Sequence, residues 1–186
     1  MLVKSYAASV QGISATVITI EVNCTKGIQF FLVGLPDVAV RESHERIISA
    51  LQVSGYKFPR NRIVINMAPA DIRKEGSSYD LPLAIGILAA AEELDASRLG
   101  HYMMMGELSL DGSLKPVKGI LPIAIKAREE GFKGFIVSDW MDFERMHSLH
   151  HYLPSEEEAF RVSVEAGIDM HMQGDNYYET ILAAVR

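Results

Sequence analysis

The chain has 186 residues, a formal net charge of -6 and a single cysteine, Cys24. A chain of this length suits one domain, or one domain with an appendage, and can bury a hydrophobic core. The acidic balance gives no overall basic footprint for nucleic acid, the apolar runs are too short for membrane insertion, and the first residues lack the pattern of a secretory signal. The lone cysteine excludes an internal disulfide and favours a reducing cytoplasm.

The first part of the chain predicts three strands. Apolar residues alternate loosely from Leu2 to Val22 around Gln11-Gly12, which is the pattern of two paired, half-buried strands. Residues 28–33 are more continuously apolar, so we expect a third strand in the centre of the sheet. The run Gly34-Leu-Pro-Asp37 ends this strand and opens a helix.

A helix is predicted from Val38 to Val53, and Ser54-Gly55 supplies its C-terminal stop. The residues that recur at helical spacing are Val40, His44, Ile47, Ile48 and Leu51. The pairs Arg41 with Glu45 and Glu42 with Arg46 have the (i, i+4) spacing of ion pairs, which we expect to keep the opposite face in water.

A polar loop precedes the second predicted helix. A short buried strand at residues 63–67 is followed by the loop Lys74-Glu-Gly-Ser-Ser-Tyr-Asp80, which leads into an apolar helix at 81–91. Asp80 is the expected cap of this helix. A functional alternative is open, because a loop that leads into a helix N-terminus is a natural site for an anion or a nucleophile.

A hairpin is predicted next. Residues 103–110 have the pattern of a strand, and Asp111-Gly112 is the dipeptide of a two-residue type I′ turn. Residues 113–117 would form the return strand, and a helix is expected at 119–130.

The last residues predict a strand at 134–137, a helix from Ser155 to Ala166, a strand at 168–172 and a helix at 176–185. Ser155 is the expected N-cap, with Glu158 at the spacing of a capping box. The chain would then end in a β-α-β-α segment. Without a linker-like tract, we expect residues 138–186 to complete the domain begun by residues 1–137.

Several motifs, in order, resemble the N-terminal domain of the magnesium-chelatase-like family of ComM and YifB. They are Thr19-Ile-Glu-Val-Asn23, Phe31-Leu-Val-Gly-Leu-Pro-Asp37, Ser54-Gly-Tyr56, Ile65-Asn-Met-Ala-Pro-Ala-Asp71, Lys74-Glu-Gly76, Tyr79-Asp-Leu-Pro-Leu-Ala-Ile85 and Gly106-Glu-Leu108. The resemblance covers residues 1 to about 137 and implies an α/β fold, an α+β sandwich shared with the Lon peptidase domain and a ribosomal protein. That fold contains a left-handed βαβ crossover, an exception to the usual handedness.

The kinship with Lon-type enzymes implies a Ser-Lys peptidase as an alternative function. Ser78 falls on the position of the nucleophile, but Leu121 occupies the position of the lysine, and an apolar side chain cannot accept the serine proton. Lys118 or Lys126 could substitute for it in space. The competing interpretation makes Ser77 and Ser78 loop and capping residues.

From about residue 131 onwards the sequence resembles a fragment of the glycoside hydrolase family three barrel, which suggests a chimera. The carrying motifs are Gly131-Phe-Lys-Gly-Phe-Ile-Val-Ser-Asp-Trp140, Ala166-Gly-Ile-Asp-Met170 and the stretch with His147, His150 and His151. In that family the nucleophile would be Asp139. A barrel typically needs about 250 residues, so this fragment cannot supply one.

Other candidate residues have plain alternatives. Five basic residues crowd one region and suggest a nucleic-acid or partner surface, although a solvated face is the commoner explanation: Lys57, Arg60, Arg62, Arg73 and Lys74. The three histidines lack matched metal-ligand spacing, so no metal is expected. Asp169 and His171 alternate on a predicted strand and are expected to face water. Glu107 follows a glycine within an apolar strand, so it is either a buried acid with a raised pKa or a residue on the exposed side of the pleat, and we favour the exposed position.

We therefore expect a non-catalytic accessory domain of an AAA+ ATPase that acts in DNA processing in the cytoplasm. The resemblance implies a hexameric parent, with homo-oligomer contacts, contacts to its own ATPase module, and DNA as a further partner. This chain contains no Gly-x-x-x-x-Gly-Lys-Ser/Thr loop, so no cofactor is expected in it, and ATP and magnesium would belong to the ATPase module.

Overall fold

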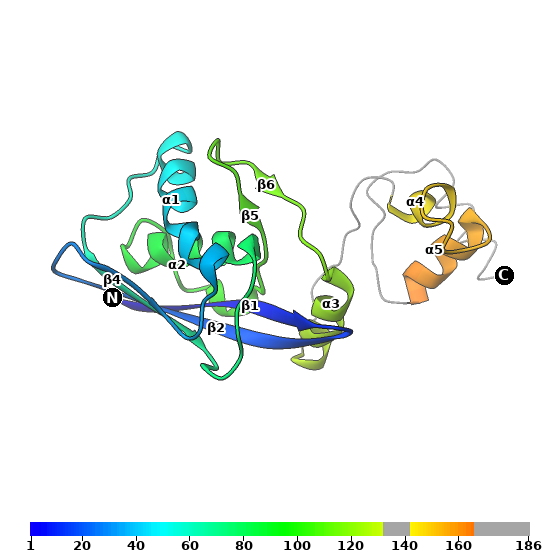
Figure 1. Ribbon diagram of the computed structural model, residues 1–186, viewed down its shortest axis with the longest axis horizontal. Helices are drawn as coiled ribbons and strands as arrows, with labels where there is room; N and C mark the ends of the chain where they lie inside the picture. Colours follow the sequence, from blue (N-terminus) through cyan, green and yellow to red (C-terminus); the bar gives the residue numbers. More distant parts are fainter. Residues whose placement is uncertain (132–141, 166–186) are drawn as a thin grey trace. The chain divides into compact units, whose positions relative to one another are not determined.

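A four-stranded sheet forms the centre of the first part of the molecule (Figure 1). The computed structural model describes residues 1–131 and 142–165. The chain divides into two compact units, Met1–Phe132 and Lys133–Arg186, which are described separately below. Within the described residues, no helix has the length and apolar character needed to cross a membrane.

The sheet has the order β1-β2-β4-β3. Strands β1 (Leu2–Gln11) and β2 (Ser14–Thr25) form the predicted antiparallel pair, and β4 (Arg62–Ala68) runs antiparallel to β2. Strand β3 (Phe30–Val33) is parallel to β4, and the intervening helix α1 (Val38–Val53) makes this a βαβ crossover. The predicted mixed α/β class is thereby confirmed.

The predicted central position of the third strand is wrong, because β3 lies at the edge of the sheet. Its continuous apolar pattern does not reflect burial on both faces. Phe31 is 43% exposed and Val33 is 48% exposed, whereas Phe30 and Leu32 pack against the core. The apolar run therefore leaves one face of an edge strand in contact with water.

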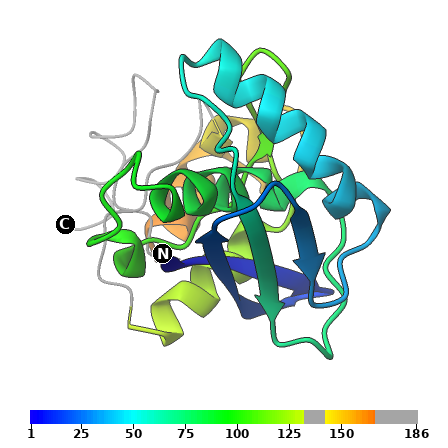
Figure 2. The same cartoon turned by 90° about the vertical axis from the view of Figure 1, so that its left-hand side faces the viewer.

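The core lies between the sheet and two helices, α1 and α2 (Asp80–Ala90), which cover the same face of it (Figures 1 and 2). Strand side chains alternate between this face and the opposite one, as the period of two requires. The fully buried strand residues on this face include Ile18, Ile20, Val22, Ile63, Ile65 and Met67. Helix α2 is buried along most of its length, which explains its apolar sequence.

Helix α1 has the predicted boundaries. The side chain of Asp37 caps it by accepting a 2.8 Å hydrogen bond from the Val40 N–H, and Gly55 follows its end with φ +84°. The prediction for Arg46 is wrong. Arg46 does not form the expected surface pair with Glu42, because its guanidinium points to Asp80 on α2.

The predicted cap of α2 is also wrong. Asp80 is the first residue of the helix, preceded by the 3₁₀ turn η1 (Ser77–Tyr79), and its side chain does not cap the helix. It accepts hydrogen bonds from Arg46 Nε at 2.7 Å and Nη2 at 2.9 Å, and from the Leu108 N–H at 3.1 Å. Asp80 therefore joins three elements instead of ending one.

The hairpin around Asp111 is shorter and looser than predicted. Strands β5 (Glu107–Leu108) and β6 (Leu114–Lys115) form an antiparallel pair, and residues 109–113 connect them. The prediction of a two-residue turn is therefore wrong. Gly112 has φ +83°, but Asp111 does not have a positive φ, which a type I′ turn would require. The 3₁₀ turn η2 (Leu99–His101) precedes this hairpin, and helix α3 (Ile120–Glu129) follows it and contacts β1 and β2.

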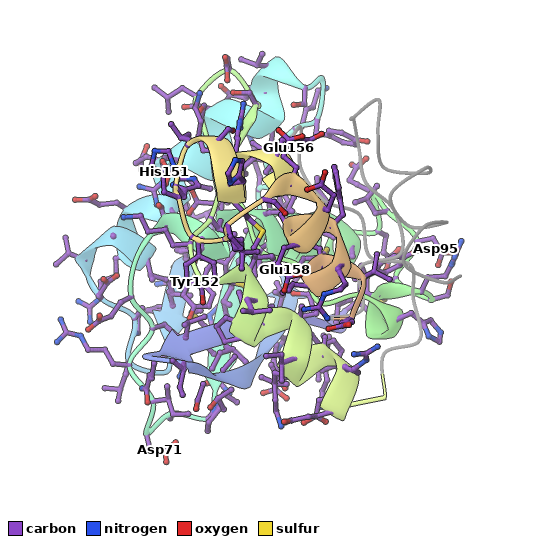
Figure 3. The ribbon with its side chains drawn as sticks, turned by 90° about the vertical axis from the view of Figure 1, so that its right-hand side faces the viewer. Asp71, Asp95, His151, Tyr152, Glu156 and Glu158 are labelled. Carbon is purple, nitrogen blue, oxygen red and sulfur yellow. The ribbon has the colours of Figure 1, made fainter. Side chains whose placement is uncertain are left out.

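In the second unit the structure describes α4 (Asp142–Ser148), which the sequence pattern does not predict, and α5 (Glu156–Glu165). The predicted cap of α5 is confirmed, since Ser155 Oγ accepts a 3.2 Å hydrogen bond from the Glu158 N–H. Figure 3 shows Glu156 and Glu158 on α5, with His151 and Tyr152 on the segment before it. The predicted elements at 134–137, 168–172 and 176–185 lie outside the described residues.

Candidate functional site

Two segments that are far apart in sequence lie side by side at the start of α2. The Gly106 N–H donates to the Ser78 carbonyl at 2.8 Å, and the Leu81 N–H donates to the Gly106 carbonyl at 3.0 Å. The bond from Leu108 to Asp80 extends this pairing. The Ser77-Ser78 turn and the Gly106-Glu-Leu motif are therefore held together by main-chain hydrogen bonds.

The loop before Ser77 is fixed from its other side. Gly76 has φ +83°, and its N–H donates a 3.1 Å hydrogen bond to Asp37 Oδ2. The other carboxylate oxygen of Asp37 caps α1. One carboxylate thus sets the position of both the α1 N-terminus and the serine-containing turn.

A cavity of about 490 Å³ opens beside this turn. Its lining includes Ser77, Ser78, Glu107, Arg73 and Lys118. Ser77 Oγ donates a short hydrogen bond to Glu107 Oε2, and within the described parts of the chain the Ser78 hydroxyl has no hydrogen-bond partner. A volume of this size is typical of small-ligand sites.

The structure separates the three residues considered for the lysine role. Leu121 lies in the first turn of α3, is 58% exposed and does not line the cavity. Lys126 is paired with Glu129 at 3.2 Å and Glu130 at 2.9 Å, and hydrogen bonds to these carboxylates raise its pKa. Of the three, Lys118 is the one that shares a cavity with Ser78.

Glu107 and Tyr79 complete the polar part of the cavity. Glu107 is half-buried and bonded to Ser77, so it is neither a plain exposed residue nor an isolated acid. Tyr79 is 2% exposed, and burial raises the pKa of its phenol while a hydrogen bond with Ser9 partly offsets this effect. The Ser77–Glu107 bond was not predicted. The adjoining Gly106-Glu-Leu motif was its only sequence signal.

Lys74 does not belong to a basic surface, which corrects one residue of the predicted patch. It is fully buried, and its Nζ donates to the Gly34 carbonyl at 2.8 Å and to the Pro69 carbonyl. Burial lowers the pKa of this ammonium group, while the charge of Asp71 opposes the effect. Lys74 therefore ties the loop after β3 to the loop after β4.

The other basic residues are divided between different places. Lys57 and Arg60 precede β4 and line a second hollow of about 620 Å³, whereas Arg73 follows β4, lines the first cavity and pairs with Glu75 at 3.2 Å. The guanidinium of Arg62 lies 5.4 Å from the centre of the Phe31 ring. The seven residues of β4 span about 20 Å, so closeness in sequence does not produce one basic patch.

The histidines of the second unit have separate surroundings. A ring nitrogen of His147 lies 3.0 Å from the Leu153 carbonyl oxygen, and His150 and His151 are exposed. Across residues 1–131 and 142–165, no three acidic, cysteine or histidine side chains gather as a metal site would require. Asp139, Asp169 and His171 lie outside the described residues.

Fold and cavity together define a mixed α/β domain with a serine-lined cavity at the start of its second helix. Residues 20–140 match the family model described as subunit ChlI of Mg-chelatase. The chain belongs to this Mg-chelatase-like family, which includes ComM and YifB, as the motif series predicts.

Three relatives illustrate the similarity. The chain is 45% identical over 129 residues to YifB of Escherichia coli, which covers 69% of this chain and 26% of YifB. It is 45% identical over 125 residues to the competence protein ComM of Haemophilus influenzae, covering 67% of this chain and 25% of ComM. It is 32% identical over 95 residues to Lon protease 2 of Bacillus subtilis, covering 51% of this chain and 17% of that protease. The chain spans about a quarter of the length of the first two relatives.

A second family model matches the other end of the chain. Residues 111–186 match the glycosyl hydrolase family 3 N-terminal domain, which confirms the predicted resemblance. The two matches overlap at residues 111–140. This is the region in which the sequence motifs change from one family to the other.

Proposed function

We propose that this chain is a non-catalytic accessory domain of a ComM/YifB-type AAA+ ATPase that acts in DNA processing in the cytoplasm. Family membership supports the proposal, and one relative is named a competence protein. The family resemblance implies a hexameric parent in which ATP and magnesium belong to the ATPase module. The role of this domain would be to contact its own oligomer, a partner or DNA.

One observation favours contact with an anionic partner. The hollow of about 620 Å³ is lined by Lys57 and Arg60, and Glu93 is its one acidic lining residue. Neither cation takes part in an ion pair within the described portion of the chain. A concave surface lined by two cations and one carboxylate suits the phosphate backbone of DNA, although the protein as a whole is acidic.

Salt-dependent DNA binding tests this role. The full chain is titrated against a fluorescein-labelled duplex oligonucleotide by fluorescence anisotropy, from about 50 mM to about 200 mM salt. The double variant Lys57→Glu, Arg60→Glu should weaken binding and make the slope of log K against log salt shallower by about two. The control Lys115→Glu, Arg128→Glu makes the same change in net charge outside the hollow. No binding of the wild-type chain at the lowest salt concentration excludes the DNA role.

The second candidate function is a Ser-Lys peptidase, and the shared cavity of Ser78 and Lys118 favours it. In this function neutral Lys118 accepts the proton of the Ser78 hydroxyl as Ser78 Oγ attacks a peptide carbonyl, and it passes that proton to the leaving amine as the C–N bond breaks. Water then hydrolyses the acyl ester on Ser78 and frees the serine. Cleavage of casein or a fluorogenic peptide should then be lost in both Ser78→Ala and Lys118→Ala, but not in the exposed control Ser97→Ala. Absence of cleavage by the wild-type chain leaves the accessory role in place.

A glycosidase function rests on the family resemblance of the motif that contains Asp139, which lies outside the described residues. Retaining glycosidases need two carboxyl groups about 5 Å apart. Hydrolysis of a nitrophenyl glucoside that is lost in Asp139→Asn would establish this function against the accessory role.

A further inference from the structure

One edge of β1 is only partly covered. Its other edge pairs with β2 along the whole strand. On the open edge, Tyr6 forms a bridge with Met103, and its carbonyl accepts a 2.8 Å hydrogen bond from the Met104 N–H. The next outward group, the Ala8 N–H, meets only the thioether sulfur of Met105 at 3.2 Å, and sulfur is a weak acceptor. Regular pairing on this edge therefore ends before Ala8.

The main chain of Val10 continues this open edge. Groups two residues apart point to the same side of a strand, so the N–H and C=O of Val10 point outward like those of Tyr6 and Ala8. Across the described ranges, no main-chain hydrogen bond reaches the outward groups of Val10. The covering segment has already turned away, because the Gly106 N–H binds the Ser78 carbonyl instead.

The cavity of about 490 Å³ lies along this same edge. Residues 8–11 of β1 form one wall, and Pro116, Val117 and Lys118 form another. Pro116 has no N–H, so the second wall cannot supply a complete ladder to β1. The cavity is thus bordered by a strand in which the outward N–H and C=O of Val10 have no main-chain partners among the described residues.

The charges of the cavity are not all compensated. Arg73 is paired with Glu75, and Glu107 accepts the Ser77 hydroxyl and lies within the field of Arg46. Lys118 is exposed and takes part in no ion pair formed by the described residues. Lys118 is therefore the lining cation of this cavity that has no carboxylate of the described residues at ion-pair distance.

We propose that this cavity binds an extended peptide segment, which adds to the sheet beside Ala8 and Val10 and places an acidic side chain next to Lys118. An antiparallel strand residue opposite Val10 would exchange both N–H···O bonds with it, as in an ordinary antiparallel pair. Lys118 would select an aspartate or glutamate of the peptide. The site takes part in binding whether or not Ser78 cleaves a bound peptide, and it is separate from the Lys57 and Arg60 hollow.

Panning a random-peptide library against the full chain tests the proposal, because the library samples many sequences and does not require one to be chosen in advance. We expect enriched peptides with a shared acidic position, and fluorescence anisotropy of one enriched peptide then gives its Kd. Enrichment of no peptide rejects the proposal.

Main-chain pairing is tested on both partners. Val10→Pro removes the outward N–H without removing a bond to β2, and should weaken binding by about tenfold or more. Lys4→Pro is the matched control, since Lys4 lies on the same edge but away from the cavity. N-methylation of the peptide residue that pairs with Val10 should weaken binding equally while leaving the protein unchanged. Binding that is unaffected by both changes contradicts strand addition.

The acidic preference is tested by the variant Lys118→Glu. This variant should bind the acidic peptide more weakly and bind its lysine-substituted form more tightly. If a duplex oligonucleotide displaces the peptide, the cavity is a nucleic-acid site and the peptide assignment is wrong. Retained peptide binding in the Lys57→Glu, Arg60→Glu variant separates this site from the proposed DNA surface.

Discussion

At the residue scale, the ammonium group of Lys74 ties two loops together. Its hydrogen bonds to Gly34 and Pro69 are reinforced by main-chain bonds from the Lys74 N–H to the Leu35 carbonyl and from the Asp37 N–H to the Lys74 carbonyl. Asp37 in turn holds the turn that carries Ser77 and Ser78 through Gly76. Lys74 therefore supports the cavity without lining it.

Removing this side chain should destabilise the fold. We predict that Lys74→Ala lowers the free energy of unfolding by about 2–4 kcal/mol, because it leaves buried carbonyls unpaired and opens a void. Lys74→Met keeps most of the packing and should cost less. The exposed control Lys57→Ala should change stability by no more than about 0.5 kcal/mol in urea denaturation. Equal effects of the alanine variants would show that the buried bonds contribute nothing.

The lowered pKa of Lys74 predicts a specific dependence of stability on pH. Between its folded pKa and the ordinary value of 10.5, the unfolded chain binds more protons at this group than the folded chain. The contribution of Lys74 to stability should therefore increase as the pH rises through this window. The measurement is the unfolding free energy of wild type minus that of Lys74→Met at several pH values, since subtraction removes groups common to both proteins. A difference that falls with pH has the wrong sign for this explanation.

Gly34 is a second position where one atom matters. It has φ +100°, and a Cβ placed there would lie 2.2 Å from the Met67 carbonyl oxygen, whereas Gly12, with φ +61°, has open space around it. We predict that Gly12→Ala costs about 1–2 kcal/mol from the backbone conformation alone. Gly34→Ala should cost clearly more, because β4 must also move. Thermal unfolding of the two variants provides the comparison, and equal costs would rule out the steric contribution.

At the element scale, the buried ion pair between Arg46 and Asp80 joins α1 to α2, and the bond from Leu108 adds β5 to the same carboxylate. The hydrogen bond with Asp80 raises the pKa of Arg46 above its ordinary value. Asp80 is fully buried, so removing its carboxylate leaves a partly buried charge and a main-chain donor without their partner.

We predict that Asp80→Ala lowers the free energy of unfolding by about 3–5 kcal/mol. Asp95, whose side chain projects at the surface (Figure 3), supplies the control, and Asp95→Ala should cost well under 1 kcal/mol. A double-mutant cycle of Arg46→Ala with Asp80→Ala, measured by urea denaturation, should show strong coupling. Additive effects would mean that the two residues act independently.

The elements differ in how far sequence determines them. Helix α1 is predictable to the residue, because Asp37 and Gly55 give local signals that fix its ends. The position of β3 depends on which strands pair, and an apolar run does not distinguish an edge strand from a central one. Asp80 has the local pattern of a cap, but tertiary contacts with Arg46 outweigh that preference.

The candidate site was likewise predictable from the sequence only in part. The loop from Lys74 to Asp80 and the Gly106-Glu-Leu motif mark the right region because family motifs point to them. The burial of Lys74 and the bond between Ser77 and Glu107 could not be predicted, since each depends on a residue distant in sequence being brought alongside. The prediction of a single basic patch is wrong because β4 separates its residues.

At the scale of the whole molecule, the hydrophobic core of the first unit is built from residues between Val3 and Leu108. We predict that a chain ending at Phe132 unfolds cooperatively, with a free energy of unfolding within about 1 kcal/mol of the value for the same transition in the full chain. Circular dichroism during urea denaturation measures both. Loss of cooperative unfolding in the shorter chain would instead support the sequence-based expectation that the C-terminal segment completes the first domain.

The buried ammonium group of Lys74 also allows the opening of the two loops to be measured chemically. An amine-reactive acylating reagent reaches the exposed Lys57 in the folded protein, but it reaches Lys74 only when the loops after β3 and β4 separate. Mass-spectrometric comparison of acylation at these two lysines therefore measures how often the loops open under native conditions. A partner that binds the neighbouring cavity and holds the loops closed would slow the reaction at Lys74 but not at Lys57.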